Sequence, residues 1–165
     1  MNSFINPFSV IIAFALLLVV LDFLKPQAAR IILGIFFLVM ALGVNLTVLL
    51  TDPTLMVAAG ANALLPIYRW FFTTILAWNP PVFIIPLIIF ETTVGLLILS
   101  KGRWVRYGLA AGIVFCIGLV PVGIEEITSP AIGLALAFLL RRNFDRSLPE
   151  IVSSIFRPKP AIKAL

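Results

Sequence analysis

The positive charges of this chain are confined to the gaps between long apolar stretches, and this pattern constrains its fold more than any other feature. Eleven of the twelve Lys and Arg residues fall in three segments: 25–30, 101–106 and from 141 onwards. With 62% hydrophobic and 12% charged residues, the chain carries more apolar surface than one water-soluble core can bury. The sequence therefore predicts an all-α protein built as a transmembrane helical bundle.

Five apolar stretches have charged or proline-rich borders: 8–24, 30–51, 81–100, 104–122 and 127–140. At about 1.5 Å per residue, the middle three are long enough to cross a hydrocarbon core of about 30 Å. The outer two are shorter, so we expect flanking residues or local bilayer thinning to complete their crossings. The prediction is one integral-membrane domain over 1–165 with about five spanning helices, ending in a basic tail over 141–165 that faces the lipid.

The same charges predict an orientation, because Lys and Arg near helix ends are retained in the cytoplasm. The three basic segments share one side only if the number of spans is odd. We therefore expect a multi-pass protein of the plasma (inner) membrane with its N-terminus outside and its C-terminus inside. A cleaved signal peptide is the competing interpretation of the first stretch, but its positive charges would precede the apolar run, whereas Lys25 and Arg30 follow it.

The segment 52–80 is long and unusually apolar for a solvated loop. Pro66 suits the first position of a helix, and apolar residues recur at spacings near 3.6 as far as Trp78. We expect a short helix at the outer interface, where Trp and Tyr are favoured. A lid over a cavity between the helices is the alternative. Arg69 is the lone cation of this side and a plausible partner for Glu125 and Glu126.

Missing residue types exclude several chemistries. There is no His, which removes His-based haem and metal centres, and a single Cys cannot form a C-x-x-C redox pair. We expect Cys116 to be a buried, inert thiol. No Walker loop, dinucleotide fingerprint or zinc-protease motif is present. The net charge of +5 lies at membrane boundaries, where anionic lipid attracts it, so we predict no nucleic acid, no metal and no intrinsic cofactor.

Glu91 is the best candidate for a site, because it lies near the middle of the stretch 81–100. A carboxylate at that depth costs roughly 2.5 to 3.5 kcal/mol even on lenient insertion scales, so we expect Glu91 to face the bundle interior. Thr92 and Thr93 follow it, and Asn45 in the stretch 30–51 has a comparable depth and can hydrogen-bond towards it. The pattern leaves two interpretations open: a proton or ligand site, or a polar contact that joins two helices.

Small and acidic residues complete the candidates. Gly95 lies one turn beyond Glu91 on the same face, and Gly108 and Gly112 form a G-x-x-x-G face suited to close helix packing within the protein. Asp22, near the end of the first stretch, is expected to reach the membrane interface beside Lys25.

The run from Glu91 to Arg106 reads E-T-T-V-G-L-L-I-L-S-K-G-R-W-V-R. Its E-x-x-x-G-x-L-x-L pattern and the following G-x-x-x-R turn resemble the DoxX-like membrane proteins. The resemblance covers roughly residues 30–140, which would form a four-helix unit with the first helix as an addition. It implies association with quinone-linked oxidoreductases or with redox maintenance of the cell envelope.

Two classes of function follow from these observations. The first is an accessory or scaffolding subunit that has no catalysis of its own and binds the lipid bilayer and other membrane subunits, in a quinone-linked redox or other energy-transducing complex. The alternative is a small bundle that binds a quinone, lipid or other apolar ligand near Glu91, with proton exchange as a variant. A transporter is a weaker variant, since no inverted repeat is visible.

Overall fold

The computed structural model describes residues 7–123 and 128–156, and this part of the chain is helical without any β-strand. The first half contains α1 (Pro7–Leu24), α2 (Pro26–Val39), a π-helical segment η1 (Met40–Asn45), α3 (Leu46–Thr51), α4 (Thr54–Gly60), α5 (Pro66–Trp70) and a second π-helical segment η2 (Phe71–Leu76). The second half contains α6 (Pro80–Leu99), α7 (Arg103–Leu119), a 3₁₀ turn η3 (Val120–Val122), α8 (Ser129–Leu140) and α9 (Leu148–Phe156).

Three helices of the described chain are long and apolar enough to cross a membrane. They are the continuous helix Pro26–Thr51, formed by α2, η1 and α3, then Pro80–Leu99, and Arg103–Val122. These match the three central stretches expected from the sequence, although the first begins four residues before the predicted position 30. It begins early because Pro26 occupies the first turn, where a missing N–H has no cost.

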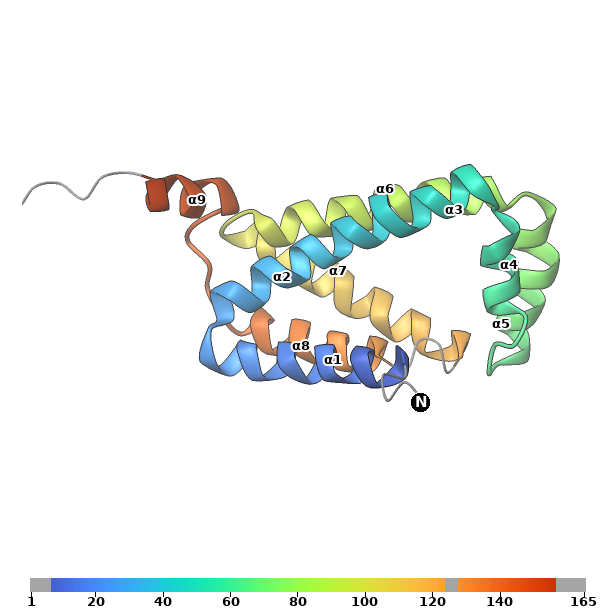
Figure 1. The fold of residues 1–165 in the computed structure, drawn as a ribbon, viewed down its shortest axis with the longest axis horizontal. Helices are drawn as coiled ribbons and strands as arrows, with labels where there is room; N and C mark the ends of the chain where they lie inside the picture. The colour runs from blue at the N-terminus through green and yellow to red at the C-terminus, as the bar shows by residue number, and fades with distance from the viewer. Residues whose placement is uncertain (1–6, 124–127, 157–165) are drawn as a thin grey trace, which may run out of the picture.

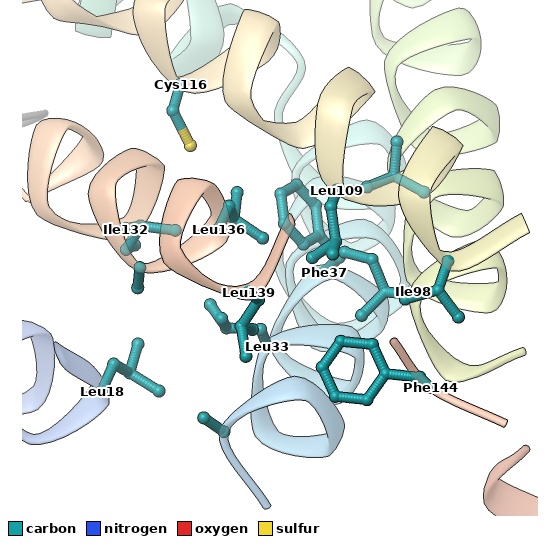
Figure 2. Close-up of a cluster of buried hydrophobic side chains, with 14 residues drawn as sticks. Leu18, Leu33, Phe37, Ile98, Leu109, Cys116, Ile132, Leu136, Leu139 and Phe144 are labelled. Carbon is teal, nitrogen blue, oxygen red and sulfur yellow. The ribbon is translucent and has the colours of Figure 1, made fainter. Parts of the chain in front are cut away.

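The helices pack around one apolar core. α2 contacts α1 and α6, α7 contacts α6 and α8, and α8 returns to α1 and α2. Figure 2 shows side chains from these elements converging, among them Leu33, Phe37, Leu109, Leu136 and Leu139. Cys116 is 4% exposed within this cluster, so the expectation of a buried thiol is confirmed.

The bundle has two different ends (Figure 1). At one end lie the turn between α1 and α2, the turn between α6 and α7, and the segment that follows α8; we call this the basic end, because Lys25, Lys101 and Arg141 belong to it. At the opposite end, α4 and α5 lie across the ends of α3 and α6. The N–H of Leu64 donates to the carbonyl of Pro121 at 2.9 Å, so this crossing segment reaches as far as η3.

Several details differ from the sequence expectation. The segment 52–80 holds α4 as well as the predicted helix from Pro66. Asp52 precedes α4 and accepts the N–H of Thr54, the first residue of this helix, at 3.0 Å. The predicted basic tail contains α9, which is tied to the bundle by a hydrogen-bonded ion pair between Lys101 and Glu150. The last predicted span is only the 12-residue α8, about 18 Å long.

Candidate functional site

Glu91 and Asn45 meet in the interior between α6 and the end of η1. Glu91 is 3% exposed and Asn45 is 6% exposed. The amide Nδ2 of Asn45 donates to Oε2 of Glu91 at 2.6 Å. The interior position of Glu91 and its hydrogen bond to Asn45, both expected from the sequence, are therefore present.

The π-helical segment η1 explains how Asn45 reaches this position. A π turn holds one more residue than an α turn, so it rotates the following residues about the helix axis. Asn45 is the last residue of η1, and η1 packs directly against α6. Short π segments inside α-helices occur frequently at functional sites. No expectation from the sequence included this π-helical segment.

The two threonines after Glu91 have different environments. Thr93 is exposed, and its hydroxyl donates to the carbonyl of Ile89 in its own helix at 2.7 Å. The hydroxyl of Thr92 is buried, and it has no hydrogen-bond partner among the described residues. Of the two residues, only Thr92 therefore has a buried, unpartnered hydroxyl, one position along α6 from Glu91.

Arg69 lies in the segment that crosses the end of the bundle. Its Nη2 donates to the carbonyl of Ala63 at 3.1 Å, which closes the turn between α4 and α5. Its predicted partners Glu125 and Glu126 lie outside the described residues. Trp70 and Trp78 are 52% and 85% exposed, as aromatic residues of an interfacial belt would be.

The three glycines singled out from the sequence lie where helices approach closely. A Cβ at Gly95 would be 2.9 Å from the carbonyl oxygen of Gly34 in α2. A Cβ at Gly108 would be 2.8 Å from the backbone N of Ile98 in α6, and one at Gly112 would be 3.0 Å from Leu136 in α8. At these glycines, α6 approaches α2 closely, and α7 approaches α6 and α8 closely.

Arg30 is the main interior residue that sequence reasoning misplaced. It was expected at the membrane boundary, where anionic lipid attracts it, but it is fully buried within the chain. Its Nη1 donates to the carbonyl of Ser100 at 2.8 Å, and its Nη2 donates to the carbonyl of Arg146 at 2.9 Å. Its guanidinium lies 4.8 Å from the ring centre of Phe144. Arg30 therefore joins the start of α2 to the α6–α7 turn and to the segment after α8.

Two further bonds hold the same segment at the basic end. Gly102 adopts φ +64°, a conformation that glycine tolerates best, and its N–H donates to the carbonyl of Phe144 at 2.8 Å. Arg106 donates to Oδ1 of Asn143 at 2.8 Å. The G-x-x-x-R turn that the sequence analysis noted thus holds the segment following α8 against the bundle.

Asp22 is the second correction. It was expected to reach the interface, yet it is 3% exposed. Both of its carboxylate oxygens are buried without a hydrogen-bond partner among the described residues. It lies between α1 and α8 because these helices pack along each other, a contact that no local sequence signal reveals.

Residues that could hold a metal are not gathered anywhere in the described chain: no group of three His, Cys, Asp or Glu side chains comes together there. No family model matches the chain, and neither a curated protein nor a solved structure is significantly similar to it. The resemblance to DoxX-like proteins therefore rests on its short motifs and stays a prediction.

Proposed function

We propose that this chain is a non-catalytic accessory subunit, a membrane-embedded helical scaffold within a quinone-linked redox complex or another energy-transducing complex. The observation that supports it most is the contrast between the inside and the outside of the bundle. Inside, Arg30 and Asn45 bond to other parts of the same chain. Outside, 67% to 72% of the most apolar stretch of each long helix is not buried by the chain itself, which leaves broad apolar faces for lipid and neighbouring subunits.

In this proposal the chain crosses the plasma (inner) membrane five times, with the N-terminus outside and the basic end in the cytoplasm. α1 and α8 supply the first and last spans, because each lies alongside the long helices in the bundle (Figure 1). The short α8 gains length from its flanking residues and from local thinning of the bilayer. Cysteines introduced at Asn62 and Arg103, both exposed, should then be labelled from opposite sides of the membrane. Labelling from the same side would contradict the five-span arrangement.

Purification in a mild detergent tests the subunit role. The tagged chain should retain stoichiometric partner subunits, and crosslinks should map to the exposed faces of the long helices. An isolated chain that carries a stoichiometric apolar molecule, with no partner after crosslinking in the native membrane, would contradict this role.

The second candidate function is binding of a quinone, lipid or other apolar ligand beside Glu91. The unpartnered hydroxyl of Thr92 and the π-helical segment η1 favour it. In this case Thr92→Val, which keeps the shape and removes the hydroxyl, should lower ligand occupancy without loss of fold. Thr93→Val is the matched control, because the hydroxyl of Thr93 bonds its own helix and is exposed. Equal occupancy in both variants would count against a ligand at this position.

A further inference from the structure

A pocket opens at the basic end between α1 and α8. It has a volume of about 280 Å³ and is lined by Asp22, Phe23, Phe138, Arg141 and Arg142. The rings of Phe23 and Phe138 lie 5.0 Å apart and join the two helix ends. The guanidinium of Arg141 lies 5.9 Å from the ring centre of Phe138, on the same side of the bundle. The pocket is open on one side and is large enough for a small polar group.

The acidic and basic side chains that line this pocket lie at different depths. Asp22 is 3% exposed, so it forms the deep wall, whereas Arg141 and Arg142 are exposed and lie at the mouth. Both oxygens of Asp22 lack a donor within the described chain and expose almost no surface to the pocket, so a ligand pairs with them only after the neighbouring side chains move aside. A buried polar group without a partner is unfavourable, and such a group in a native fold calls for a water, an ion or a ligand. The deep wall therefore needs a hydrogen-bond donor, and a cation meets that need best.

The mouth of the pocket carries two positive charges and therefore favours an anion. Arg side chains bind phosphate in a bidentate geometry, and their place at the end of two apolar helices is where lipid phosphates lie. A metal cation fits poorly, because one carboxylate is its only acidic ligand in this pocket and two guanidinium groups repel it. A simple phosphate satisfies the mouth and leaves the deep carboxylate unpaired. A ligand with an ammonium group and a phosphate group satisfies both ends.

We propose that this pocket binds the phosphoethanolamine headgroup of a membrane phospholipid, with its ammonium on Asp22 and its phosphate on Arg141 and Arg142. The exposed Phe23 and Leu24 at the end of α1 then contact the acyl chains. The site is specific for a primary amine, because –NH₃⁺ donates three hydrogen bonds whereas the trimethylammonium of phosphatidylcholine donates none. Phosphatidylglycerol has the phosphate but lacks the cation. This assignment requires only that the bundle lies in a membrane, so it does not depend on a role in a larger complex.

Native mass spectrometry of the full chain, delipidated in a maltoside detergent and re-exposed to defined lipids, tests the proposal. Because a charge-assisted hydrogen bond contributes about 1.5–3 kcal/mol, phosphatidylethanolamine should bind about tenfold or more tightly than phosphatidylcholine. Asp22→Asn keeps the size of the side chain and should reduce this preference to near one. Arg142→Gln should weaken both lipids together. The control variants are Asp145→Asn and Arg103→Gln, which alter exposed charges at the basic end outside this pocket and should leave the preference unchanged.

Free O-phosphoethanolamine distinguishes a lipid from a soluble ligand. If the acyl chains contribute as proposed, the free headgroup should compete with phosphatidylethanolamine only at concentrations at least a hundredfold higher. Competition at equal concentration would overturn the lipid assignment and favour a soluble ligand. Equal retention of the two lipids by the unaltered chain, or an unchanged preference in Asp22→Asn, would overturn the headgroup assignment itself. If Asp22→Asn does not fold, the Arg142→Gln result and the preference of the unaltered chain still decide the question.

Discussion

Replacing Arg30 by methionine should destabilise the basic end of the bundle more than removal of any exposed cation there. Arg30 is fully buried and donates two hydrogen bonds, to the carbonyls of Ser100 and Arg146. A hydrogen bond from a charged group contributes about 1.5–3 kcal/mol, so the two together contribute about 3–6 kcal/mol. Methionine fills part of the volume and removes the cost of burying a guanidinium, and the exposed Arg146 allows water to reach its carbonyl. We therefore expect a net loss of about 2–4 kcal/mol.

The effect should also be localised. The bond to Arg146 and the contact with Phe144 attach the segment after α8, so Arg30→Met should increase backbone hydrogen exchange over 141–156 more than over α6. Arg30→Lys retains the charge but cannot reproduce the planar fork that reaches two carbonyls, so it should lose about half as much stability.

Detergent unfolding provides the assay. The chain in mixed micelles is titrated with sodium dodecyl sulfate and followed by circular dichroism, with hydrogen exchange measured on the same samples. Arg103→Met is the matched control, because Arg103 is an exposed cation at the same end, and its loss should change stability by less than about 0.5 kcal/mol. If Arg30→Met and Arg103→Met unfolded at the same detergent concentration, with equal hydrogen exchange over 141–156, Arg30 would not hold this segment as we expect.

Three more outcomes follow from the described contacts. If Glu91 only joins helices, Glu91→Gln should leave the free energy of unfolding nearly unchanged. Glu91→Leu should lower it by about 1–3 kcal/mol, because the amide of Asn45 loses its partner. Equal stability of the two variants would contradict this. Gly108→Ala should cost about 1–3 kcal/mol in the same titration, since its Cβ would lie 2.8 Å from backbone, whereas Gly118→Ala meets no atom within 4 Å and should be neutral or slightly stabilising. The ammonium of Lys101, followed by a backbone N–H, lowers the pKa of Glu150 from 4.5 to about 2, so the contribution of this pair to holding α9 should be fully present above pH 4.5 and lost as the pH falls towards 2. Hydrogen exchange of α9 against pH checks this, and Glu150→Gln should abolish the dependence.

Local signals in the sequence were sufficient to predict the long helices. Apolar runs bounded by Pro and by charges place α6 and α7 within a few residues of their observed ends. The Asp52-Pro-Thr54 sequence also carries a helix-start signal, and reading it would have predicted α4. Pro149 and Glu150 in the first turn of α9 are a similar signal within the segment that was read as a basic tail.

Whether the sequence predicted the burial of a polar residue depended on the position of that residue within its apolar stretch. A carboxyl in the middle of an apolar stretch, as at Glu91, has no solvated alternative, so the sequence alone indicates an interior position and a partner. Arg30 and Asp22 lie near the ends of their stretches, where reaching water is an equally good local solution. Arg30 is buried by a segment that includes Arg146, 116 residues away, and Asp22 is buried by the packing of α8 against α1. Boundary charges are therefore the positions at which a sequence of this kind predicts least, and in this bundle they carry both the attachment of the segment after α8 and the pocket assigned to a lipid headgroup.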